Sequence, residues 1–92
     1  MQELDELKAG ELRGAVEAML IASSEAVSAT TLAQVLGAEP GLVAATLADL
    51  AAEYSDKNRG MQLREVAGGW RLFTHPAYHD QVQALLMSWA AR

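Results

Sequence analysis

The stretch Glu65–Pro76, EVAGGWRLFTHP, decides how this sequence folds. An extended run, MQLREVA, precedes the pair Gly68-Gly69, and a second extended run, WRLFTH, follows it and ends at a proline. Glycine pairs favour tight β-hairpin loops because the primed turns of such loops need positive φ. The sequence therefore predicts a hairpin whose loop is Gly68-Gly69.

This loop fixes a predicted register and two predicted faces. In that register Ala67 faces Trp70, Glu65 faces Leu72 and Leu63 faces Thr74. One face should cover the core, since side chains alternate along a strand, and it consists of Met61, Leu63, Trp70 and Leu72. Glu65 falls on the same face, so we expect a bulge or a rim position there. The other face is mixed and carries Arg64, Val66, Arg71 and Phe73.

Three amphipathic helices are predicted before the hairpin, from apolar residues at helical spacing. The first runs from about Glu11 to Ser23. The second follows Ser28, a good N-cap, and ends at Gly37. The third opens at Pro40, where the missing N–H costs nothing, and is about fifteen residues long. The apolar positions are Leu12, Val16, Met19 and Leu20, then Leu32, Val35 and Leu36, then Val43, Leu47, Leu50 and Tyr54.

A last helix is predicted after Pro76, with Tyr78, Val82, Leu85, Leu86 and Trp89 along one side. The order helix, short extended AVS, helix, turn, helix, hairpin is that of a winged helix-turn-helix. We therefore predict a mainly α fold with a small β-hairpin: a three-helix core, a wing and a C-terminal helix. Residues 11–92 form this domain and residues 1–10 an N-terminal extension. The predicted core is Leu12, Val16, Leu20, Leu32, Leu36, Val43, Leu47, Leu50, Leu63, Trp70, Leu72 and Val82.

Size and composition narrow the class of protein. At 92 residues the chain suffices for one domain with one modest core. Truncating Leu47 or Trp70 to Ala should then cost roughly 3–5 kcal/mol. The absence of cysteine excludes disulfides and thiolate metal sites, which fits a cytoplasmic protein. No apolar run is long enough for export or for crossing a membrane.

Charge is distributed unevenly along the chain. Residues 1–55 carry nine acids against Lys8 and Arg13, a balance of −7, and residues 56–92 carry +2, which together give the net charge of −5. A groove-reading helix needs Arg, Lys, Asn or Gln at exposed positions. The third predicted helix has none of these and contains Asp49 and Glu53. The pattern therefore favours a protein partner over DNA.

The sequence also resembles a known family. Residues 15–37, AVEAMLIASSEAVSATTLAQVLG, and residues 56–86, DKNRGMQLREVAGGWRLFTHPAYHDQVQALL, are similar to segregation and condensation protein B, an accessory subunit of the bacterial SMC condensin complex. The hairpin with its trailing Thr74, Pro76 and Tyr78 is the most specific part, although Trp70 stands where the pattern usually has tyrosine.

The resemblance implies a non-catalytic role in chromosome condensation and segregation. Family members have two tandem winged helices, and this sequence corresponds to the first. By resemblance the first domain forms a homodimer, and the second supplies much of the contact with the kleisin, segregation and condensation protein A, and through it with SMC. The implied location is the cytoplasm, at the nucleoid, with no membrane partner and no cofactor.

Candidate contact residues follow from the exposed positions of the third helix and the outer face of the hairpin. The third helix presents small or apolar groups that allow another backbone to approach closely. The alternative reading is that alanine is simply a good helix former on a solvated face. The candidate protein-contact residues are Leu42, Ala45, Asp49, Ala52, Val66 and Phe73.

A second hypothesis is a winged-helix regulator that binds DNA through a basic wing. Four cations cluster near the hairpin and could contact phosphates. So few contacts give only weak, salt-sensitive binding, and the same charges suit a solvated ribbon. These candidate residues are Lys57, Arg59, Arg64 and Arg71.

A metal site or an enzyme is the third possibility. His75, His79 and Asp80 lie within one helical turn and a half. Two imidazoles and a carboxylate can hold zinc, but the simpler interpretation is that His75 caps the helix and His79 is solvated. No nucleophile with an orienting base stands out. We therefore predict no catalytic residues, no metal and no cofactor.

Overall fold

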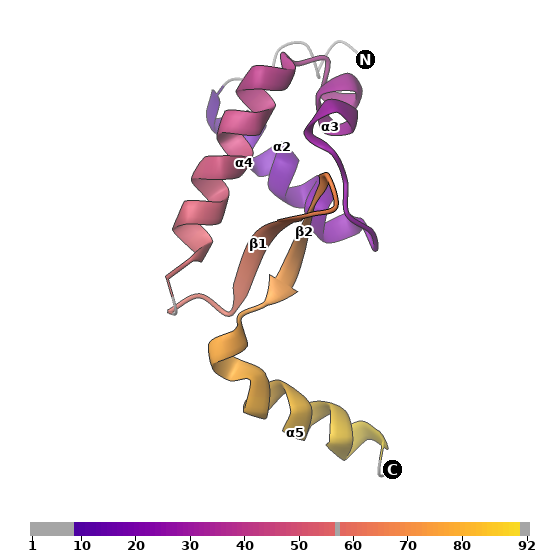
Figure 1. Ribbon diagram of the computed structural model, residues 1–92, viewed down its shortest axis with the longest axis vertical. Coiled ribbons are helices and arrows are strands. Elements are labelled where there is room, and N and C mark those ends of the chain that lie inside the picture. Colours follow the sequence, from indigo (N-terminus) through magenta and orange to yellow (C-terminus); the bar gives the residue numbers. More distant parts are fainter. Residues whose placement is uncertain (1–8, 57, 91–92) are drawn as a thin grey trace.

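The computed structural model describes residues 9–56 and 58–90, and its element order is that of a winged helix-turn-helix (Figure 1). Three helices form one end of the molecule, a two-stranded antiparallel hairpin closes their core, and a last helix projects away from this body. The predicted fold class is confirmed. The elements are α2 (Ala9–Ala22), α3 (Ala29–Leu36), α4 (Pro40–Tyr54), β1 (Met61–Val66), β2 (Gly69–Thr74), a 3₁₀ turn η1 (Pro76–Tyr78) and α5 (His79–Ala90).

The predicted helix caps are present. The Ser28 side chain accepts a hydrogen bond from the Thr31 N–H at 3.1 Å, and Gly37 ends α3 in the left-handed conformation at φ 65°. Pro40 is the first residue of α4. At the N-terminus α2 begins at Ala9, so residues 9 and 10 of the predicted extension are helical. The rest of that extension, residues 1–8, lies outside the described part of the chain.

The hydrophobic core lies between α2, α3, α4 and β1. Nine of the predicted core residues are buried there, and Trp70 and Leu72 pack against it half-buried. Ala33 is buried in α3, whereas Val35 is 53% exposed. The buried side of this short helix consists of Leu32, Ala33 and Leu36, and Val35 lies outside it. The buried core residues are Leu12, Val16, Leu20, Leu32, Ala33, Leu36, Val43, Leu47, Leu50, Tyr54 and Leu63.

The hairpin register differs from the prediction by two residues. Leu63 pairs with Leu72, Glu65 with Trp70 and Val66 with Gly69. The loop residues with positive φ are Ala67 (52°) and Gly68 (82°) rather than the two glycines. A shift of two residues leaves the faces unchanged, so the predicted core side is correct. Glu65 is exposed in regular pairing with Trp70, which is the rim position and not the bulge.

Gly69 is in β2 because another segment lies against it. A Cβ built on Gly69 would lie 2.9 Å from the Cβ of Ala26, closer than real side chains come. The neighbouring Val27 and Trp70 form an isolated antiparallel bridge. The short extended segment before α3 therefore adds to the hairpin as a third strand of one residue pair. Its contact with Gly69, and not the turn, explains the second glycine.

The helix α5 does not belong to the core. The chain turns at His75 and Pro76, and α5 then leads away from the body, so that the whole molecule is 48 Å long and only 27 × 24 Å across (Figure 1). No residue of α5 is buried, so the prediction that Val82 lies in the core was wrong. Among the described residues no single helix is long and apolar enough to cross a membrane; α3 and α4 pass that test only together, bent by 118°.

Candidate protein-contact surface

The outer face of α4 carries most of the predicted contact residues. Leu42 is 53% exposed, and Ala45, Asp49 and Ala52 are exposed with it. The buried face of the same helix holds Val43, Thr46, Leu47, Leu50 and Tyr54. The Thr46 hydroxyl donates to the Leu42 carbonyl at 2.9 Å, so it is satisfied inside the helix. The structure thus brings the four α4 candidates onto one solvent-facing side made largely of methyl groups.

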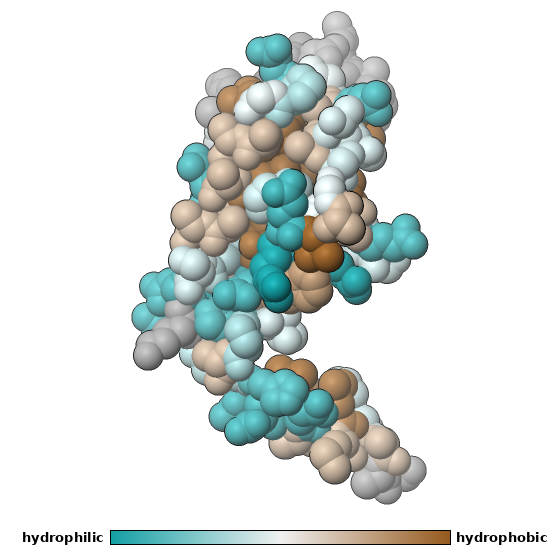
Figure 2. Space-filling view, in the orientation of Figure 1, coloured by the Kyte–Doolittle hydropathy of each residue, from teal (hydrophilic) through white to brown (hydrophobic). Residues whose placement is uncertain are grey.

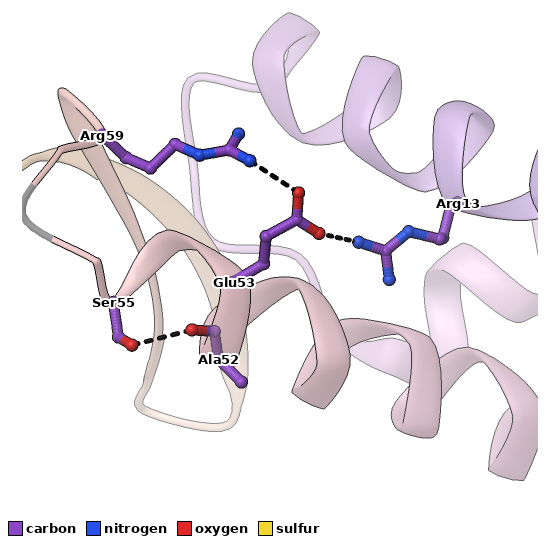
Figure 3. A network of polar contacts seen from close by, with 5 residues as sticks. All are labelled: Arg13, Ala52, Glu53, Ser55 and Arg59. Carbon is purple, nitrogen blue, oxygen red and sulfur yellow. Dashed lines mark hydrogen bonds and ion pairs between the residues drawn. The ribbon is translucent and has the colours of Figure 1, made fainter.

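A three-residue ion-pair network lies at the C-terminal end of α4 (Figure 3). Glu53 accepts from Arg59 at 2.8 Å through one carboxylate oxygen and pairs with Arg13 of α2 through the other. The three side chains are between 38% and 48% exposed, so each ion pair contributes little free energy. The network nevertheless neutralises one of the α4 acids and connects α2, α4 and the loop before β1.

The outer side of the hairpin is organised around Phe73. Arg64 and Arg71 are directly opposite each other in the register, and their guanidinium carbons lie 5.5 Å and 5.6 Å from the centre of the Phe73 ring. Both distances are within the range of cation–π attraction. Phe73 is consequently half-buried by its own wing and offers less free surface than the sequence suggested.

The four predicted DNA-contact residues are not equivalent. Arg59 is paired with Glu53, and its guanidinium carbon lies 5.6 Å from the Tyr54 ring centre. Its positive charge is therefore largely balanced within the protein. Lys57 lies outside the described residues. Within the described ranges, Arg64 and Arg71 are exposed and form no ion pair. Two cations therefore remain on the wing as free positive charge.

Val66 and Phe73, which the sequence had grouped together, border two different surface hollows. A hollow of about 480 Å³ lies between the 23–28 segment and the hairpin tip and includes Val66 and Thr31. A second, of about 320 Å³, lies between the end of α2 and the hairpin and includes Phe73 and Ile21. No α4 residue lines either of them, so the predicted contact residues form an α4 surface and two separate wing positions.

Sequence reasoning missed an exposed apolar surface on α5. Leu85, Leu86 and Trp89 of α5 are 50%, 49% and 51% exposed. Their helical spacing indicated a core helix, because periodicity alone does not say what covers an apolar stripe. The signal that could have found this surface is composition: no charged residue occurs between Gln81 and Ala90.

The histidines do not form a metal site together. The Nδ1 atom of His75 accepts a hydrogen bond from the Ala77 N–H at 3.1 Å, which confirms the predicted cap. His75 is buried and His79 is exposed. In residues 9–56 and 58–90 there is no group of three or more potential metal ligands.

Known proteins are similar to this chain over most of its length. The family model of segregation and condensation complex subunit ScpB matches residues 14–91. Segregation and condensation protein B of Moorella thermoacetica is 40% identical over 82% of this chain and 38% of its own length. The Symbiobacterium thermophilum protein of the same name is 38% identical over 77% of this chain and 32% of its own length. The chain thus spans less than two-fifths of these relatives.

Solved structures agree with the sequence comparisons. The crystal structure of ScpB from Mycobacterium tuberculosis superposes with a TM-score of 0.88 at 34% identity, over 95% of this chain and 54% of that one. A dimer of the ScpB N-terminal domain complexed with a ScpA peptide gives a TM-score of 0.74 at 28% identity, over 79% of this chain and 91% of that one. The chain therefore belongs to the family of segregation and condensation complex subunit ScpB.

Proposed function

We propose that residues 11–92 are the N-terminal winged-helix module of a ScpB subunit, which forms a homodimer and supports binding of the kleisin ScpA within the SMC complex. The strongest support is the likeness to an ScpB N-terminal domain that is itself a dimer complexed with a ScpA peptide, 91% of which this chain covers. The role in chromosome condensation and segregation, with a cytoplasmic, nucleoid-associated location, is part of the same proposal.

The chemistry of α4 supports a polypeptide partner. In a DNA-reading winged helix this helix enters the major groove and presents cations or amides to the base edges. Here its exposed side presents Leu42, Ala45, Asp49 and Ala52, and no Lys, Arg, Asn or Gln occurs from Pro40 to Tyr54. Phosphates would be repelled by Asp49, whereas a peptide backbone can approach the alanines closely. We assign this α4 surface to the kleisin segment.

The proposed role is non-catalytic. A subunit that joins a second copy and a kleisin acts through contact surfaces, which require neither a nucleophile nor a cofactor. The two histidines fit this role because His75 is engaged in capping the turn at Pro76. SMC ATPase activity would then reside in the partner.

Titration of a fluorescently labelled ScpA segment with this chain tests the proposal. We expect saturable binding, and we expect Ala45→Arg to weaken it at least tenfold because a long charged side chain blocks the α4 surface. Ala44→Arg is the matched control: Ala44 is also exposed on α4 but lies about 100° around the helix from Ala45. Thermal melts should show that both variants remain folded. Absence of binding to any part of ScpA at tens of micromolar protein would contradict the proposal.

A weak DNA contact through the wing remains a second candidate. It is favoured by one observation, the exposed pair Arg64 and Arg71 with no acidic partner among the described residues. Both guanidinium groups lie over the Phe73 ring. A ring contact does not use the N–H donors at the edge of a guanidinium group, so these donors can still bind phosphates. Two such contacts would supply little affinity at physiological salt.

A further inference from the structure

The helix α5 is twelve residues long and has no covering partner within the described chain. Its substantial contacts are with the adjoining turn η1, and none of its residues is buried. Figure 1 shows it projecting from the open end of the hairpin. Isolated helices of this length are marginally stable in water, and most helical stability in proteins comes from packing of an apolar face. An element that packs on α5 would therefore supply what the chain itself does not.

The composition of α5 is that of a buried contact surface. Val82, Leu85, Leu86 and Trp89 follow one another at intervals of three, one and three, so they form one stripe. We call this the α5 stripe. Ten successive residues, from Gln81 to Ala90, carry no charge. Figure 2 shows hydrophobic residues along the edge of α5 that faces the body. A helix destined for solvent would carry charged residues on its outer side.

A second apolar surface lies on the body near the point where α5 leaves it. The hollow of about 320 Å³ is lined by five large apolar residues, Leu20, Ile21, Met61, Leu72 and Phe73, and by three polar ones, Ser23, Arg71 and Thr74. We call this the α2–β2 hollow. Ile21 is 64% exposed there although it is one of the largest aliphatic residues. Two exposed apolar surfaces are thus joined only by the short connection from Thr74 through η1.

Both surfaces expose apolar side chains that a second copy would remove from water. Leu85, Leu86 and Trp89 of the α5 stripe are 50%, 49% and 51% exposed, and Ile21 in the α2–β2 hollow is 64% exposed. Burial of apolar area is the dominant favourable contribution in most protein–protein association.

We propose that the α5 stripe is the self-association surface. Two α5 helices pack side by side across a two-fold axis, and each stripe also covers the α2–β2 hollow of the other copy. This inference rests on the proposed function, in which the chain dimerises, and goes beyond it by naming the surface. A second copy is the occupant that the charges favour. An uncharged stripe can meet its own copy without like-charge repulsion, as a two-fold interface requires.

Sedimentation velocity of the 92-residue chain from 1 to 200 µM tests the assignment. We expect a concentration-dependent dimer whose dissociation constant rises at least 100-fold in Leu86→Glu and in Ile21→Glu. Met87→Glu is the matched control, since Met87 is 68% exposed but lies on the other side of α5, and its dimer should persist. In a Trp70→Phe background, Trp89 is the remaining tryptophan, and its emission should shift to the blue as the dimer forms.

The outcomes separate this inference from the proposed function. The inference is overturned if the unaltered chain stays monomeric at 200 µM, or if Leu86→Glu and Met87→Glu dimerise equally. A blue shift of Trp89 that requires a ScpA segment would identify the kleisin as the occupant and would also overturn it. A monomeric chain would also contradict the homodimer of the proposed function, whereas the other two results would leave that function standing. ScpA binding, measured separately with the labelled segment, tests the rest of the proposed function. Far-ultraviolet circular dichroism checks that every variant is folded.

Discussion

Gly69 and Ala26 are in contact across the hairpin and the segment before α3, so closely that a Cβ on Gly69 would lie 2.9 Å from the Ala26 Cβ. The same atom would lie 3.1 Å from the Ala26 carbonyl carbon and from the Val27 nitrogen, which are backbone atoms that cannot move aside alone. Next to this contact, the Val27 N–H donates to the Trp70 carbonyl at 2.9 Å and the Trp70 N–H donates to the Val27 carbonyl at 2.7 Å. The tip of the wing is thus attached to the segment before α3 by one close contact and one backbone bridge.

Gly69→Ala should therefore be strongly destabilising. We expect the free energy of unfolding, from urea denaturation, to fall by about 2–3 kcal/mol because the overpacked site must separate the wing from the 26–27 segment. Gly68→Ala should cost about 1 kcal/mol, since φ is +82° there but nothing lies within 4 Å. Gly14→Ala, in open space on α2, should instead stabilise by about 1 kcal/mol. Equal stability of Gly69→Ala and the unaltered protein would refute the close contact.

Tyr54→Phe should leave the protein as stable as before or stabilise it by about 1 kcal/mol. Tyr54 is 1% exposed, and its buried hydroxyl has no hydrogen-bond partner among the described residues. Removing an unsatisfied polar group recovers its desolvation cost, whereas Tyr54→Ala should cost about 3–5 kcal/mol through the cavity it leaves. Chemical denaturation of the three proteins measures both effects. A loss above 1 kcal/mol in Tyr54→Phe would show that the hydroxyl is satisfied.

Glu53→Gln should lower the unfolding free energy by no more than about 1 kcal/mol at low salt. Glu53 pairs with Arg13 and Arg59, but all three side chains are well exposed, so solvent screens the attraction. The loss should disappear at 1 M salt, where the Debye length is ~3 Å. Asp49→Asn removes the same charge from α4 without breaking either ion pair, and it should be neutral. A salt-independent loss would mean that the network acts through packing.

Duplex DNA should bind this chain only weakly. With two free cations on the wing, Arg64 and Arg71, we expect a dissociation constant above about 10⁻⁴ M at physiological salt and a log–log salt slope no steeper than about 2. Fluorescence anisotropy with a labelled duplex, repeated at low salt, measures both quantities. The double variant Arg64→Glu, Arg71→Glu should abolish the low-salt signal. Submicromolar binding at physiological salt would favour the DNA-binding alternative over the proposed function.

Most of the fold could be predicted because its signals are local. The Ser28 cap, the left-handed Gly37 and the first-turn Pro40 each act through neighbouring backbone groups, and all three are present as predicted. The predicted contact residues on α4 likewise share one face, since a helix places residues by its period alone. Their partner stays a prediction, because a helix period contains no information about what binds.

Other features required contacts between distant segments. The predicted hairpin loop was misplaced because the two glycines look equivalent in the sequence. Gly68 is required for its positive φ, whereas Gly69 is required because Ala26 lies too close for a side chain. Only the contact with Ala26 distinguishes the two positions. The helical period placed Val35 on the apolar face of its helix and Val82 in the core. Both lie outside the core, because a period gives the side of a helix and not the depth of its burial.

The amino-acid sequence by itself determined which segments are helical, where they are capped, which face of the hairpin is apolar and that α4 offers no cation to a groove. Tertiary structure decided the register of the wing, the engagement of Arg59 with Glu53 and the isolation of α5 from the body. The physical reason is the separation along the chain of the groups that interact. The hydrogen bonds of helices and turns join residues only a few positions apart. Steric contact, ion pairing and burial depend on which remote side chains arrive at the same place.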